Sequence, residues 1–335
     1  MHRMGRNMTV KKTIFGEIGT DPVYSYKITN KNETSIDVLT YAATWQNFEV
    51  VEDGVKHSLI EHFDNLDDYI KTPYMVGKTI GRVAGRIKDA KFSINGVDYQ
   101  MTPNNGKNVM HSGDHGLQSQ NFDSTIDSDN SVLFTHTVKG EDEFPGTLTV
   151  EVRYSLNDDD EVQITYNAKT DHDTLFNPTC HVYFDIDDEN IRQQQLKINS
   201  KRFVDVDAKK IPTGKLLATT NAYDFKNFKK IGQGLKQLKP LDKVEFDDAF
   251  VVNKKAATLK SEHRAIDLYT DRDGLVIFTA NPVDALKAQN HEFSSIAMEL
   301  QTLPDAIHHP DFGNTILLAN QEVSYTNKYK YRKLN

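Results

Sequence analysis

The clearest alternation of apolar and polar residues lies in the middle of the chain, over residues 147–168. The apolar set over its first half is Leu148, Val150, Val152, Tyr154 and Leu156, with polar residues between them. A period of two over ten residues is typical of a β-strand with one buried face. Residues 157–160 are polar and acidic, and the alternation resumes from Val162 to Ala168. The pattern predicts an antiparallel hairpin whose acidic loop lies in solvent.

Similar patterns recur along the chain. Residues 92–94 and 97–99 flank Asn95-Gly96, a pair that supplies the positive φ angles of a tight hairpin turn. Residues 323–331 place Val323, three tyrosines and Asn327 on one face, and Leu275 to Phe278 is a short apolar run suited to a buried strand. Helical patterns are short, and we expect helices only within residues 64–74 and 283–289.

Strands at short intervals, separated by Gly, Asn, Asp and Pro, favour a sandwich over an alternating α/β fold. No Gly-, Ser- or Pro-rich linker and no fixed repeat interrupts the pattern. We therefore predict an all-β protein, a large antiparallel β-sandwich with few short helices. Residues 1–335 are expected to form a single domain, with residues 1–10 as a frayed N-terminal extension.

Charge and cysteine content narrow the function classes. The formal net charge is −8, which disfavours nucleic acid and anionic membranes as partners. No apolar run approaches the length of a membrane span or of a signal peptide. The single cysteine, Cys180, excludes an intrachain disulfide and favours a cytoplasmic location. Lysines 226, 229, 230 and 236 are expected to form a solvated loop face.

Two glycine-rich stretches concentrate polar side chains. Residues 81–87 carry Arg82 and Arg86, whose guanidinium groups suit polar ligands. Residues 104–116 carry His111 and His115 among three glycines. Taken alone, each stretch is equally consistent with a surface loop. A metal site at the two histidines is disfavoured, because their spacing aligns them only in a helix, which glycines oppose.

Three later stretches hold the remaining candidates. His181 follows Cys180 in residues 177–184, and histidine titrates near neutral pH. A Cys–His catalytic pair is disfavoured, because neighbours on a strand point to opposite faces. Glu299 lies in an otherwise apolar strand pattern, where burial would raise its pKa. Residues 308–312 resemble a metal-binding sequence, but no third ligand lies at a fitting spacing. Asp247 precedes an apolar strand. It could be a residue of the turn that leads into this strand, or it could bind sugar hydroxyls.

In their order along the chain, these motifs resemble those of the aldose 1-epimerase (galactose mutarotase) family. The matching stretches are Gly81–Ile87, the loop around His111, Asn177–Phe184, Phe246–Phe250 and Glu299–Ala306, with weaker matches at Glu143–Leu148 and Ile211–Gly214. The resemblance implies a galactose mutarotase-like supersandwich fold and an isomerase that interconverts the α and β anomers of an aldose such as glucose or galactose. By the same resemblance, the isomerase would need no cofactor and no metal, and the protein would be a monomer or homodimer.

Carried over by position, the resemblance makes His181 the general acid and Glu299 the general base. Sugar contacts would come from Arg86, His111, Tyr183 and Asp247. The chain departs from the family pattern at four positions, where Gly85 stands for Asn, Val276 for Gln, Asp248 for His and Phe122 for Trp. These departures leave the acid and base in place and concern the preference for a particular sugar.

Three alternatives stay open. A hexose-6-phosphate 1-epimerase would need added cations, for which Arg82 or Lys107 are available. A disaccharide 1-epimerase would act on maltose or lactose. A non-catalytic sugar-binding protein would have no need of the acid and base, and the presence of both His181 and Glu299 argues against it.

Overall fold

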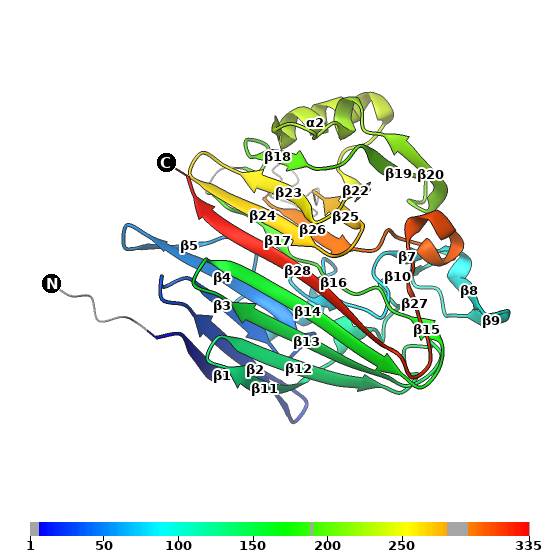
Figure 1. Cartoon of the computed structure of the whole chain (residues 1–335), viewed down its shortest axis with the longest axis horizontal. Helices are drawn as coiled ribbons and strands as arrows, with labels where there is room; N and C mark the ends of the chain where they lie inside the picture. Colours follow the sequence, from blue (N-terminus) through cyan, green and yellow to red (C-terminus); the bar gives the residue numbers. More distant parts are fainter. Residues whose placement is uncertain (1–6, 188–189, 280–293, 335) are drawn as a thin grey trace.

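The computed structural model describes residues 7–187, 190–279 and 294–334. Three large antiparallel sheets dominate this part of the chain (Figure 1). The first has five strands in sequence order, β1 (Thr9–Ile18), β2 (Asp21–Thr29), β3 (Ser35–Leu39), β4 (Thr44–Glu52) and β5 (Val55–Ser58). The all-β prediction is thus confirmed.

The second sheet has nine strands, which Figure 1 shows side by side from β12 through the red β28 to the yellow β24 and β23. Their order is β11 (Asp123–Ser128), β12 (Ser131–Val138), β13 (Leu148–Leu156), β14 (Glu161–Thr170), β28 (Glu322–Lys333), β24 (Arg264–Thr270), β23 (Lys255–Lys260), β18 (Gln195–Ile198) and β21 (Lys229–Lys230).

The third sheet has six strands, β17 (Tyr183–Phe184), β26 (Ile296–Gln301), β25 (Gly274–Phe278), β22 (Asp247–Val251), β19 (Arg202–Val206) and β20 (Pro212–Ala218), in that order. Four two-stranded ribbons complete the β-structure. They pair β10 (Val109–Met110) with β7 (Arg86–Ile87), β15 (Thr174–Leu175) with β27 (Ile316–Leu317), β16 (Thr179–Cys180) with β6 (Thr79–Ile80), and β8 (Lys91–Ile94) with β9 (Val97–Gln100).

The hairpins predicted from the sequence are confirmed. In β13 and β14 the register runs from Leu148 opposite Thr170 to Leu156 opposite Val162, and the apolar face is buried throughout. The β8–β9 turn has positive φ at Asn95 and Gly96, as the Asn-Gly pair requires. In β28 the side chains of Asn327, Tyr329 and Tyr331 are buried on one face.

One hydrophobic core joins the three sheets. Trp45 of β4, Tyr154 of β13, Tyr329 of β28 and Met298 of β26 all belong to it and are at most 1% exposed. The Trp45 ring lies 5.1 Å from that of Tyr329, in an edge-to-face contact typical of aromatic pairs. On the other face of the six-stranded sheet, Ala249 and Val276 pack with Phe312 and Leu303 in a smaller apolar cluster.

The helices are few. The one expected within residues 64–74 forms as α1 (Leu66–Lys71), where the Asn65 side chain caps the N-terminus by accepting from Asp68 N. The stretch 283–289 lies outside the described residues. Helix α2 (Ile231–Leu238) was not predicted, because Gly232 and Gly234 have low helix propensity. Both glycines pack closely, Gly232 on Arg192 and Gly234 on two phenylalanine rings, where a larger side chain would clash.

Of the lysines expected on a solvated loop face, Lys226, Lys230 and Lys236 are exposed as predicted, but the segment forms β21 and α2 rather than a loop, and Lys229 is half-buried. Lys229 lies in β21 and donates to the carbonyl oxygens of Asn221 and Ala222 at 2.9 and 2.8 Å. Its ammonium also lies 4.1 Å from the centre of the Phe225 ring. Burial lowers the pKa of Lys229 to about 8. None of the helices in the described residues is long and apolar enough to cross a membrane.

Candidate active site

The floor of the main cavity is one face of the six-stranded sheet. Successive side chains of a strand point to opposite faces, so every second residue of each strand reaches this floor. Strand pairing places Glu299 of β26 opposite Val276 of β25, which in turn lies opposite Ala249 of β22. The floor residues are Tyr183, Val206, Asp247, Ala249, Val276, Phe278, Glu299 and Gln301.

Loops from elsewhere in the chain form the walls. Gly85 and Arg86 come from the start of β7, and Met110 and His111 from the end of its partner β10. Further wall residues are Pro73, Tyr74, Met75, His181, Lys210, Glu245 and Pro304. The site thus combines segments from residue 73 to residue 304, which only the folded sheets bring together.

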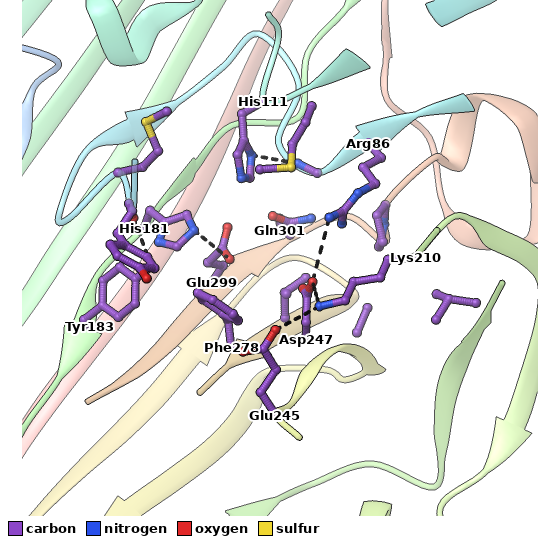
Figure 2. A pocket seen from close by; sticks show the side chains of 18 of the residues that line it. Arg86, His111, His181, Tyr183, Lys210, Glu245, Asp247, Phe278, Glu299 and Gln301 are labelled. Carbon is purple, nitrogen blue, oxygen red and sulfur yellow. Dashed lines mark hydrogen bonds and ion pairs between the residues drawn. The ribbon is translucent and has the colours of Figure 1, made fainter. Parts of the chain in front are cut away.

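His181 and Glu299 form the most deeply buried acid–base pair in the cavity (Figure 2). His181 Nε2 lies 3.5 Å from Glu299 Oε1, and the two side chains are only 7% and 4% exposed. Burial raises the pKa of Glu299 to about 8, helped by the charge of Asp247. Burial lowers the pKa of His181 to about 4. Between these values the pair holds one proton, and a shift of that proton across 3.5 Å converts a neutral pair into an ion pair.

The backbone around His181 is held on both sides. His181 N donates to Lys78 O at 2.9 Å, and Gly77 N donates to His181 O at 3.0 Å. The alternation along this segment directs Cys180 and Val182 into the core and His181 and Tyr183 into the cavity. The Tyr183 hydroxyl donates to Tyr74 O at 2.9 Å, which fixes its ring 5.0 Å from that of His181.

His111 stands across the cavity from Glu299 and is neutral. Its Nδ1 accepts from Gly85 N at 3.2 Å, so the proton of the neutral ring is on Nε2. Burial, with the charges of His181 and Arg86, holds the pKa of His111 well below its usual value. The ring is 5.5 Å from that of His181, edge to face. His111 can therefore donate a hydrogen bond from Nε2 without carrying charge.

The more exposed end of the cavity holds a network of charges (Figure 2). Lys210 Nζ lies 2.7 Å from Asp247 Oδ2 and 3.2 Å from Glu245 Oε1, and Arg86 Nη2 lies 3.8 Å from the same Asp247 oxygen. Burial opposes it, but the two carboxylates hold the pKa of Lys210 above its usual value. These contacts orient Asp247 and leave its second oxygen able to accept hydrogen bonds.

All six residues expected in the site, Arg86, His111, His181, Tyr183, Asp247 and Glu299, line this one cavity. Sequence reasoning missed Lys210, Phe278 and Gln301. Gln301 could have been predicted from the alternation of side chains, since it lies two residues beyond Glu299 on the same strand. Lys210 comes from a loop with a positive φ, and no strand pattern places it here.

Other candidates lie elsewhere. Arg82, considered as a phosphate ligand, is fully buried and binds both carboxylate oxygens of Asp142, with Nε 2.6 Å from Oδ2. Lys107 pairs with Asp89 at the surface. Neither lines the cavity, so the expectation that they could serve the sugar is wrong. Asp248 turns away from the cavity toward Lys243, at 3.1 Å, and Phe122 packs on His136 with the ring centres 5.2 Å apart.

Cys180 is fully buried, and burial raises its thiol pKa to about 12, so it is no nucleophile. His308 Nδ1 and His309 Nε2 face Asp305 at 2.7 and 3.5 Å. Across residues 7–187, 190–279 and 294–334, no group of three metal-ligating side chains converges.

A family model described as "Aldose 1-epimerase" matches residues 24–331. The chain belongs to the aldose 1-epimerase family. It is therefore an enzyme of the isomerase class, from a family whose members act on sugars.

Two curated relatives cover nearly all of the chain. A maltose epimerase from Levilactobacillus brevis is 40% identical over 97% of this chain and 100% of its own. An aldose 1-epimerase from Streptococcus thermophilus is 33% identical over 97% and 99%. A crystal structure of a galactose 1-epimerase from Lactobacillus acidophilus shares the fold, with a TM-score of 0.87 at 24% identity over 98% of this chain and all of the other. The expected supersandwich is confirmed by this match.

Proposed function

We propose that this protein is a 1-epimerase in which Glu299 and His181 exchange protons with a pyranose. The observation that carries this proposal is the pair itself. Two buried side chains with oppositely displaced pKa values face each other across 3.5 Å on the floor of a cavity lined with hydrogen-bonding groups. Such opposed displacement is typical of acid–base partners.

In the proposed reaction, the Glu299 carboxylate removes the proton of the C1 hydroxyl and His181, protonated, gives its proton to the ring oxygen. The C1–O5 bond breaks as the C1 carbonyl forms, so the pair ends in its neutral form. Burial favours that neutral form, because it disfavours charge on both residues. The open-chain aldehyde rotates about C1–C2 and closes on the other face, and both protons return.

The other polar groups hold the sugar in this scheme. His111 donates from Nε2, Arg86 donates from its guanidinium group and Asp247 accepts. Tyr183 and Phe278 provide aromatic surface beside the pair, their rings 6.3 Å apart. Acid–base catalysis by positioned groups contributes roughly 10²–10⁴-fold each.

The test is the rate at which fresh α-D-glucose reaches anomeric equilibrium, followed by polarimetry. We expect the wild-type protein to accelerate this rate far above that of buffer, and Glu299→Gln and His181→Asn each to abolish most of the acceleration. If the wild-type protein left the rate of glucose, galactose and maltose unchanged, the proposal would be wrong.

We further infer that the substrates include a reducing disaccharide of the maltose type. The 40% identical relative is named for maltose, and the shape of the site supports the same for this chain. C1 must lie at the buried pair, so C4, across the ring, points toward the exposed end. There the side chains of Lys210 and Glu245 are 39% and 23% exposed. A second ring attached at C4 would lie over them.

The variant Lys210→Ala tests this inference, because it should affect activity on maltose and on glucose to different extents. We expect a larger loss of kcat/KM with maltose than with glucose, because the second ring loses a contact that glucose never makes. An equal loss with both would show that Lys210 acts only through Asp247. A phosphorylated hexose is not favoured, since both cations of the site, Arg86 and Lys210, are already paired with carboxylates.

A further inference from the structure

Gln301 is a buried amide at the floor of the cavity, and it takes no part in the proposed proton transfer. It follows Glu299 by two residues on β26, so both side chains leave the same face of the strand. Gln301 is fully buried as a residue and lines the cavity (Figure 2). It is the one side-chain amide among the described residues that line it.

Neither end of this amide has a partner. Both Oε1 and Nε2 of Gln301 are buried without a hydrogen bond in the described part of the chain. Leaving such a group unsatisfied is unfavourable, because its hydrogen bonds to water are lost on folding and nothing replaces them. A buried amide that faces a cavity and lacks any protein partner is therefore suited to a polar ligand.

The residue that faces the amide across the cavity wall is a glycine. Gly85 lies directly above it, and a β-carbon at Gly85 would stand 3.8 Å from Gln301 Nε2. Gly85 has a φ of +77°, a conformation that favours glycine. Val276, on the neighbouring strand, offers no hydrogen-bonding group. Gln301 thus lies between Glu299 and Arg86 (Figure 2), and its amide offers a ligand there a hydrogen-bonding group that the protein itself leaves unused.

We propose that Gln301 is a substrate-binding residue that recognises a sugar hydroxyl remote from C1. This rests on the proposed function, which places C1 at Glu299. Residues i and i+2 of a strand are about 6.6 Å apart along its axis, roughly the span of a pyranose ring. An amide that begins one such step from Glu299 meets the far part of the ring, where it accepts from one hydroxyl through Oε1 and donates through Nε2.

The test combines Gln301→Met, which keeps the length of the side chain but removes its polarity, with a set of monodeoxy sugars. We expect kcat/KM for glucose to fall roughly tenfold. For one monodeoxyglucose, modified at C3, C4 or C6, the same substitution should change kcat/KM less than twofold, because the hydroxyl that Gln301 binds is already missing. 2-Deoxyglucose should lose activity as glucose does.

Gln194 is a matched control. It is 1% exposed and both its amide atoms also lack partners, but it does not line the cavity. Gln194→Met makes the same chemical change in the core, and we expect kcat/KM to stay within twofold of wild type for every sugar. Should Gln301→Met fail to fold, Gln301→Asn, whose amide is withdrawn by one methylene, must show the same dependence on a single hydroxyl.

Two results would overturn the inference. An equal loss of kcat/KM on all sugars would show that Gln301 only supports the structure of the strand, and no loss on any sugar would show that it makes no substrate contact. In both cases the wild-type protein still catalyses anomer exchange, and the proposed function stands. If the wild-type protein itself were inactive on every sugar, the proposed function would fail and this inference with it.

Discussion

Replacing Glu299 by Gln should stabilise the protein at neutral pH. The carboxyl of Glu299 has an ordinary pKa of 4.5 when exposed in the unfolded chain and about 8 in the fold, mainly through burial. The unfolded chain therefore releases this proton above pH 4.5, while the folded protein keeps it until about pH 8. Stability falls as pH rises through that window, because the folded state binds more protons.

The size of the effect follows from the pKa difference. Each pKa unit corresponds to about 1.4 kcal/mol. At pH 7, which lies about 2.5 units above the pKa in the unfolded chain, the folded state is therefore disfavoured by about 3 kcal/mol, and by less where His181, 3.5 Å away, offsets the charge. A neutral glutamine of the same shape removes this penalty. For a chain of 335 residues, an unfolding entropy of about 0.7 kcal/mol/K converts 3 kcal/mol into about 4 °C in Tm.

The assay is thermal unfolding of wild type and Glu299→Gln between pH 4.5 and 8. We expect the variant to melt a few degrees higher at pH 7.5 and at the same temperature at pH 4.5. Glu52→Gln is a control of opposite sign. Although burial opposes it, hydrogen bonds from Arg264 and Tyr331 hold the pKa of Glu52 below its usual value. That variant should melt lower at neutral pH, with the deficit shrinking as pH falls. A Glu299→Gln difference that is independent of pH, or a loss of stability at pH 7.5, would refute the reasoning.

Two further predictions follow from the same structure. The kcat/KM profile for glucose should be flat between about pH 4 and 8, because the His181–Glu299 pair holds one proton there. The value of kcat/KM should fall above pH 8, where no proton is left for the ring oxygen, and below pH 4, where no base remains. A profile centred outside this window would contradict the assignment. Asp142→Ala should lower the free energy of unfolding by about 3–5 kcal/mol, because it leaves the fully buried Arg82 without its carboxylate. Asp158→Ala, which breaks the exposed pair with Lys31, should leave the free energy of unfolding measured by chemical denaturation close to that of wild type.

Most of the fold could be predicted from alternation alone. Strands such as β13 and β14 each bury one face against the shared core, so the period of two is visible in the sequence. Helix α2 could not be predicted, because its two glycines disfavour a helix locally. They are required by contacts with Arg192, Phe225 and Phe246, which lie outside the helix in the sequence. Tertiary packing overrides propensity there.

The site was predictable only in part. Taken singly, His181 and Glu299 resembled structural residues, and their order among the other motifs distinguished them. Arg82 and Arg86 looked equivalent in the sequence. The structure separates them, since Arg86 reaches the cavity while Arg82 is buried against Asp142. That difference depends on a partner 60 residues away, which local sequence does not reveal.

The reaction proposed for the pair is tested most directly by anomer exchange at equilibrium, measured by NMR on glucose and on maltose with wild type, His181→Asn and Glu299→Gln. We predict rapid exchange with wild type, at least a hundredfold slower exchange with either variant, and melting temperatures that show both variants folded. Exchange at the buffer rate with wild type, or near-normal exchange in both variants, would contradict the assignment of His181 and Glu299 as acid and base.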